Sequence, residues 1–270
     1  MNTIHKETFK KGSKTYFNSS LFFPEAVRRD VFALYGFVRI ADDFVDQVPQ
    51  DAESFYDFKE RYRSGLSGAH TGDLIVDSFV DLSKRKDFPS EWAEAFLSAM
   101  EADLSKKTYH TVDESLEYIY GSAEVIGLFM ARIMDLDEAS YWSARMLGRA
   151  MQYINFIRDI NEDIGLGRRY LALEGTPLTT LDPQTVLGDR ERFAAFLKIH
   201  LDLYRGWQAE AEQGYRFIPR RYRVAIKTAA DMYNWTARRI ERDSLIVFQR
   251  QVKPAKSRIL LQLLRNWIGL

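Results

Sequence analysis

Two sets of side chains have the types and the spacing that could hold a divalent cation. Asp42 and Asp46 stand four residues apart in FVRIADDFVDQV, and Asn155, Asp159 and Asp163 follow one another at four-residue steps in QYINFIRDINEDIG. On a helix this spacing places each set along one side. Carboxylate and amide oxygens are the ligands that Mg²⁺ prefers, and Mg²⁺ often shares its remaining positions with substrate phosphates. A cation between the two sets is the chemistry that this pattern favours.

The neighbours of both sets are mostly apolar, which predicts two buried helices. Each acidic set has one adjacent arginine, Arg39 or Arg158, and these two cannot neutralise all the acids. Unpaired charges in such surroundings would cost several kcal/mol, so divalent cations are the natural counter-charge. The alternative is that each set forms a solvated helix face with internal Arg–Asp pairs. Two such acidic sets, each in an apolar segment, favour the cation over this alternative.

Long helical periodicity, few prolines and no convincing strand alternation indicate one all-α domain over residues 1–270. The first acidic set falls in a helix between Pro24 and Pro49, and the second falls in a single helix over residues 137–165. Residues 168–189 form the longest irregular segment. The other helices are expected at 51–66, 73–86 as shorter pieces, 89–107, 112–136 and two or three within 190–268.

The composition excludes several other kinds of site. The 38 basic and 38 acidic residues give a formal net charge of zero, which argues against a nucleic-acid partner. There are no cysteines, and the four histidines are scattered, so thiolate chemistry and a helical zinc pair are excluded. No secretory signal and no apolar run of about 18 residues is present, so we expect a cytoplasmic protein.

The segments YGFVRIADDFVD and QYINFIRDINEDIGLGRRY resemble the two signatures of the squalene/phytoene synthases, and the resemblance runs from near residue 13 to about residue 250. It implies an isoprenoid (terpenoid) synthase helical bundle whose central cavity has two acidic helices facing each other across Mg²⁺. It also implies head-to-head condensation of two prenyl diphosphates through a cyclopropyl diphosphate intermediate.

The resemblance assigns roles to individual residues. The implied metal ligands are Asp42, Asp46, Asn155, Asp159 and Asp163. The four aspartates form the implied catalytic set together with Tyr35 and Arg39. The implied substrate-binding residues are Ser13, Arg39, Gln152, Asn155, Arg168, Tyr233 and Arg250. The final base is left open between pyrophosphate, Tyr35 and Tyr233. Aromatic residues expected near the cavity are Phe22, Phe23, Phe37, Phe129 and Phe156.

The substrate length depends on the depth of the tunnel. Ser20 falls where the resembling family approaches the substrate tail, and a small residue there favours two geranylgeranyl diphosphates, which give phytoene. The alternatives are a squalene or dehydrosqualene synthase that uses two farnesyl diphosphates, and a non-catalytic helical interaction protein of the same fold. Both acidic sets are complete, which disfavours the last.

Two further features need a structural account. Some family members have Gly and Thr where this chain has Glu124 and Val125, and we expect Glu124 to be a partner for an arginine. The C-terminal segment SRILLQLLRNWIGL is amphipathic. It is interpreted as a closing helix packed on the bundle, with a helix on a bilayer surface as the alternative. Transient contact with a membrane surface is expected in either case, because the product is very apolar.

Overall fold

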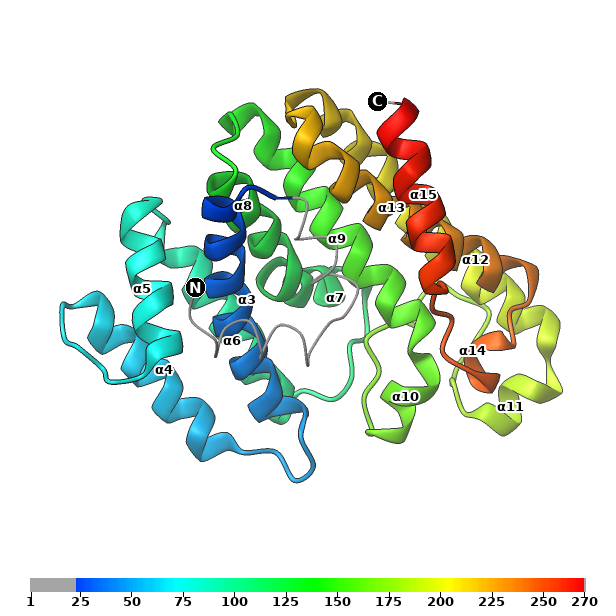
Figure 1. The fold of residues 1–270 in the computed structure, drawn as a ribbon. Coiled ribbons are helices and arrows are strands. Elements are labelled where there is room, and N and C mark those ends of the chain that lie inside the picture. Colours follow the sequence, from blue (N-terminus) through cyan, green and yellow to red (C-terminus); the bar gives the residue numbers. More distant parts are fainter. Residues whose placement is uncertain (1–22, 270) are drawn as a thin grey trace.

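Helices dominate the computed structural model, which describes residues 23–269 (Figure 1). No strand occurs among these residues, and an isolated bridge pairs Thr108 with Arg169. The predicted all-α, single-domain fold class is therefore confirmed, while the domain bounds 1–270 stay a prediction. Ser13, Ser20 and Phe22 lie outside the described residues. The central cavity stays a prediction.

The helices follow the expected order with several differences at their boundaries. The first half of the bundle comprises α3 (Glu25–Asp46), α4 (Ala52–Leu66), α5 (Leu74–Arg85), α6 (Ser90–Ser105), α7 (Val112–Ile119), the π-helical turn η1 (Tyr120–Glu124) and α8 (Val125–Ile133). The second half comprises η2 (Glu138–Ser140), α9 (Tyr141–Arg158), α10 (Ile160–Gly165), α11 (Pro183–Gly188), α12 (Arg190–Glu212), η3 (Gln213–Phe217), α13 (Arg220–Arg242), α14 (Ile246–Gln249) and α15 (Lys256–Gly269). The segment 73–86 forms the single helix α5 instead of shorter pieces.

Helix α3 is held by an apolar face that packs against α4, α5 and α6. Phe37 is fully buried and stacks on Phe79 of α5 with ring centroids 3.9 Å apart, and the fully buried Ala41 and Val45 continue the same face. The expectation of burial on every side is wrong, because Asp46 exposes 45% of its side chain. We call Asp42 and Asp46 the first acidic row, and Asn155, Asp159 and Asp163 the second. The first row therefore lies along the more open side of α3.

The second acidic row lies where two helices meet. The predicted single helix over 137–165 is interrupted at Asp159, which has φ −100° and ψ 15° and separates α9 from α10. The Asp159 N–H donates to the Asn155 carbonyl at 2.8 Å, and the Asp163 N–H donates to the Asp159 carbonyl at 2.9 Å. The chain thus bends at Asp159 while these backbone groups stay paired.

A buried histidine ties the irregular segment after α10 to the bundle. His200 of α12 has no exposed surface; its Nε2 donates to the Ala172 carbonyl at 3.1 Å, and the Tyr153 hydroxyl of α9 donates to its Nδ1 at 2.6 Å. The Ala172 carbonyl can only accept, and this fixes the neutral tautomer. Burial lowers the pKa of His200 to about 4.

This histidine predicts a loss of stability in acid. The folded state disfavours the charged ring, so the stability that its neutral form contributes is present above the unfolded pKa of about 6.5 and is lost as pH falls toward the folded pKa. Urea unfolding should show about 2 kcal/mol less stability at about pH 5 than at about pH 8 from this group. The His200→Gln variant can keep both hydrogen bonds and should lack this component. An unchanged pH dependence in that variant would assign the effect elsewhere.

Candidate active site

An arginine joins the two acidic rows at one end of the bundle. Arg168, which is buried, follows α10, and its backbone N–H donates to the Asp163 carbonyl at 2.7 Å. Its guanidinium donates to Asp46 Oδ1 and to the Val45 carbonyl, each at 2.7 Å. The bend at Asp159 and the turn after Gly165 thus bring the second row to the C-terminal end of α3.

The rows are close enough for their charges to interact. Burial raises the pKa of Asp163 to about 8, with further contributions from Asp159, Glu162 and Asp46. Burial also raises the pKa of Asp42 to about 7, and Asp46 adds to this shift, although a third of the Asp42 side chain is exposed. Burial is thus the main cause of both raised pKa values, and repulsion from neighbouring carboxylates is the second.

Most of the acids already have an arginine partner. Arg39 pairs with Asp42 at 3.0 Å and also with Asp43. Arg158 donates to Asp159 Oδ1 at 2.8 Å. Tyr35 and Arg39 are both half-buried on α3. Tyr35 lies near the charges of Arg39 and Asp42, so the structure brings these two predicted residues together with the first row.

The donor set fits a hard divalent cation. Asn155 Oδ1 is buried and has no hydrogen-bond partner among residues 23–269, so this oxygen is available to coordinate a cation. The raised pKa values of Asp42 and Asp163 indicate carboxylates that a cation would stabilise. Within residues 23–269, no group of three His, Cys, Asp or Glu side chains lies close enough together to hold a metal ion. The ligand assignments remain predictions.

A buried carboxylate beside Arg168 escaped the sequence analysis. Asp103 of α6 is 3% exposed and accepts hydrogen bonds from the hydroxyls of Tyr118, at 2.6 Å, and Tyr170, at 2.8 Å. Burial raises its pKa, whereas the two hydroxyls and the Arg168 charge lower it. Its charge also raises the pKa of Asp42, which places it beside the first row. The sequence signal for a buried Asp103 was its position three residues after Met100, on the apolar face of α6.

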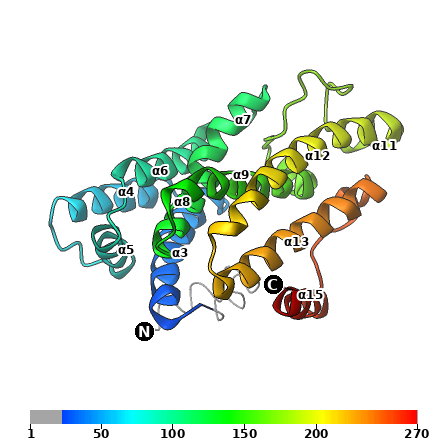
Figure 2. The same cartoon turned by 90° about the horizontal axis from the view of Figure 1, so that it is seen from above.

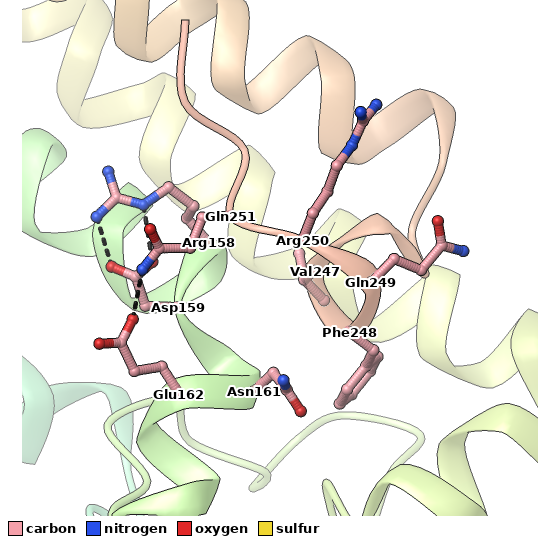
Figure 3. Close-up of a pocket in the computed structure, with 9 residues that line it drawn as sticks. All are labelled: Arg158, Asp159, Asn161, Glu162, Val247, Phe248, Gln249, Arg250 and Gln251. Atoms are coloured by element: carbon pink, nitrogen blue, oxygen red, sulfur yellow. Dashed lines mark hydrogen bonds and ion pairs between the residues drawn. The ribbon is translucent and has the colours of Figure 1, made fainter.

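The remaining predicted residues lie on the second half of the bundle. Gln152 is half-buried on α9, and Tyr233 is half-buried on α13, where its phenol lies near enough to raise the pKa of Tyr204. Arg250 lines a cavity of about 100 Å³ together with Asp159. Figure 3 shows its side chain extending away from the Arg158–Asp159 pair. The diphosphate contacts of these residues stay predictions.

Two of the aromatic residues expected at the cavity belong to the packed core instead. Phe37 and Phe129 both contact Phe79, with ring centroids 3.9 and 5.7 Å away, and at most 1% of either side chain is exposed. Phe156, in contrast, stacks on Tyr170 at 4.3 Å and so lies next to the Asp103 hydrogen bonds. Phe23, the fourth described member of that set, makes an edge contact with a tyrosine of α13.

The expectation for Glu124 is confirmed. Its side chain has no exposed surface, Arg145 Nε lies 2.9 Å from Oε2, and Arg149 Nε lies 2.6 Å from Oε1. The two arginines belong to α9, so this cluster fastens the π-helical turn η1 to the helix that carries Asn155. Gly148 permits the close approach, because a Cβ there would lie 2.3 Å from the Ala123 carbonyl oxygen.

Comparisons with known proteins identify the family of this chain. The family model "Squalene/phytoene synthase" matches residues 9–258. A 15-cis-phytoene synthase of a Paracoccus species is 27% identical over 261 residues, which cover 93% of this chain and 86% of that protein. One from Enterobacter agglomerans is 30% identical and covers 82% of this chain and 80% of that protein. A dehydrosqualene synthase crystal structure has the same fold, with a TM-score of 0.86 and 19% identity over 98% of this chain and 95% of that one. The chain therefore belongs to the squalene/phytoene synthase family of prenyltransferases.

Proposed function

We propose that the chain catalyses the Mg²⁺-dependent head-to-head condensation of two geranylgeranyl diphosphates to phytoene through a cyclopropyl diphosphate intermediate. The observation that carries the proposal is the pair of complete acidic rows joined by Arg168. The names of the similar proteins from Paracoccus and Enterobacter agglomerans support phytoene as the product. The dehydrosqualene synthase shares the fold only, so condensation of two farnesyl diphosphates to squalene or dehydrosqualene is the second candidate.

Five side chains would hold the cation: Asp42, Asp46, Asn155, Asp159 and Asp163. Mg²⁺ bound there would act as an electrophile toward the departing diphosphate, lowering the barrier to ionisation of the prenyl substrate. Arg39 and Arg168 contribute preorganised hydrogen-bond donors. Arg39 is held by Asp42 and Asp43. Arg168 is buried and held by Asp46 and the Val45 carbonyl. A guanidinium suits phosphate oxygens, since its N–H groups match their spacing.

The acid–base role of Tyr35 is constrained by its surroundings. Burial raises the pKa of this phenol, with the Arg39 charge opposing the shift and Asp42 and Asp43 adding to it. The hydroxyl therefore stays protonated at neutral pH and is suited to donating a hydrogen bond to the leaving diphosphate. Pyrophosphate is then favoured over Tyr35 as the final base, and Tyr233 stays as the alternative.

A two-substrate assay tests the proposal. Purified protein is incubated with geranylgeranyl or farnesyl diphosphate, with Mg²⁺ or with EDTA, and the extracted products are identified by mass spectrometry. We expect phytoene from the first substrate in Mg²⁺ and no product in EDTA. Preference for farnesyl diphosphate would select the second candidate. Consumption of neither substrate in Mg²⁺ would reject the enzyme proposal.

Replacement of Arg168 by lysine should separate charge from geometry. Lysine keeps the positive charge but cannot donate to Asp46 and the Val45 carbonyl while also reaching diphosphate. We expect kcat/KM to fall by about 10- to 100-fold, which corresponds to about 1.4 to 2.7 kcal/mol of transition-state stabilisation. Arg169→Lys, at the neighbouring half-buried arginine, is the matched control and should stay within about two-fold. Equal effects in both variants would contradict the role of Arg168.

We also propose a cytoplasmic location with transient contact to a membrane surface, because prenyl substrates and phytoene are apolar. Within residues 23–269, no helix combines the length and the apolar character that crossing a bilayer requires. Contact with a bilayer would then be confined to its surface, which makes exposed apolar helices the relevant elements.

A further inference from the structure

Helix α15 presents its apolar side chains outward. Twelve large apolar side chains are exposed among the described residues, and five of them lie on this one helix. These five are Leu260, Leu261, Leu264, Trp267 and Ile268, with 51% to 81% of each side chain exposed. Their spacing of one, three, three and one residues places them on one side of the helix. An ordinary closing helix buries such a face.

Polar side chains hold the inner face of α15 on the bundle. The buried Asn266 donates to Thr228 Oγ1 at 3.0 Å and to Asp231 Oδ2 at 2.8 Å, and Gln262 donates to the same Asp231 oxygen at 2.8 Å. Arg258 lies over the Trp235 ring, 5.0 Å from its centroid. All these partners belong to α13, which Figures 1 and 2 show directly beside α15 at the edge of the bundle. The interpretation of α15 as a helix packed on the bundle is therefore correct. Its outer face, however, is apolar and exposed.

Positive charge gathers around this face. Helix α15 has three basic residues and no acidic residue, and α13 has seven basic and two acidic residues. The chain as a whole has no net charge, so this edge carries a marked excess. At 3.6 residues per turn, Arg258 and Arg265 lie along one border of the apolar face and Lys256 along the other. Basic borders around an exposed apolar stripe are typical of helices that lie on anionic bilayers.

We propose that α15 docks the protein on an anionic membrane surface, with its five exposed apolar side chains in the lipid and its basic borders on the headgroups. The bundle anchors the helix through its polar face, so docking requires no unfolding. This inference deepens the proposed function, on which it rests only for the apolar nature of the substrate. A second copy of the chain is the competing occupant, but two like-charged faces would repel each other.

Vesicle binding of the full chain tests the proposal. The vesicles contain either equal parts of phosphatidylcholine and phosphatidylglycerol or phosphatidylcholine alone, and bound protein is measured by co-sedimentation. The apolar variant combines Leu260→Gln, Leu264→Gln and Ile268→Gln. Its matched control places the same change at three exposed apolar positions on other helices, namely Leu74, Leu187 and Ile199. The charge variant combines Lys256→Gln and Arg265→Gln and spares Arg258, which packs on Trp235.

We expect the wild-type chain to bind the mixed vesicles at least about ten-fold more tightly than the neutral ones. The apolar variant should lose at least about ten-fold in affinity, and the charge variant about five-fold per residue, because each basic residue contributes about that factor at an anionic surface. The matched control should bind as the wild type does.

Several results would overturn the proposal: no binding by the wild type, equal losses in the apolar variant and its control, or a wild-type dimer that the apolar variant converts to a monomer. Turnover of detergent-dispersed prenyl diphosphate should be unchanged in the apolar variant. Because vesicle binding needs no turnover, failure of docking and failure of the proposed reaction are distinguishable.

Discussion

Asp42→Asn should abolish turnover and leave the protein at least as stable as the wild type. The substitution removes an oxygen charge that the proposed Mg²⁺ site requires, so we expect kcat to fall by about 10³-fold or more. Burial and the neighbouring Asp46 disfavour the charged form of Asp42 in the folded state, as its raised pKa of about 7 indicates. A neutral amide relieves that repulsion. After discount for the exposed third of this side chain, the gain in unfolding free energy is about 1 kcal/mol.

Activity assays and urea unfolding of the same preparation measure both effects. Asp57→Asn is the matched control, because this aspartate lies on α4 with 56% of its side chain exposed and pairs with Arg61 one helical turn later. It should change neither activity nor stability appreciably. A loss of activity in Asp42→Asn accompanied by unfolding would indicate a structural role. Activity at the wild-type level would contradict the metal assignment.

The helical fold could be predicted because its signals are local. Helix α3 begins after Pro24 and ends before Pro49, since proline ends or starts helices by its own covalent geometry. The break at Asp159 could not be predicted in the same way. No glycine or proline marks it, and its backbone groups remain hydrogen-bonded on both sides. Such a bend follows from how α9 and α10 pack against different neighbours.

The acidic rows were also visible in the sequence, because four-residue spacing fixes which side chains share a helix side. Their partners were harder to find. Arg168 reaches Asp46 across 122 residues, and Asp103 meets Tyr170 across 67 residues. Such contacts depend on the tertiary arrangement, so spacing alone does not predict them. The outward apolar face of α15 is a similar case, because periodicity identifies an amphipathic helix but not which side the bundle takes.

Glu124→Ala should cause the largest loss of stability. The carboxylate has no exposed surface and accepts from both Arg145 and Arg149, so its removal leaves two guanidinium groups without their partner. Removing one member of a buried ion pair costs about 3 to 5 kcal/mol. Glu124→Gln keeps an acceptor oxygen and should cost about half as much. The matched control is Glu60→Ala, because Glu60 pairs with Arg63 but is 70% exposed, and its loss should stay below about 1 kcal/mol. Urea unfolding measures all three variants. Equal losses at Glu60 and Glu124 would show that the buried cluster does not hold η1 on α9.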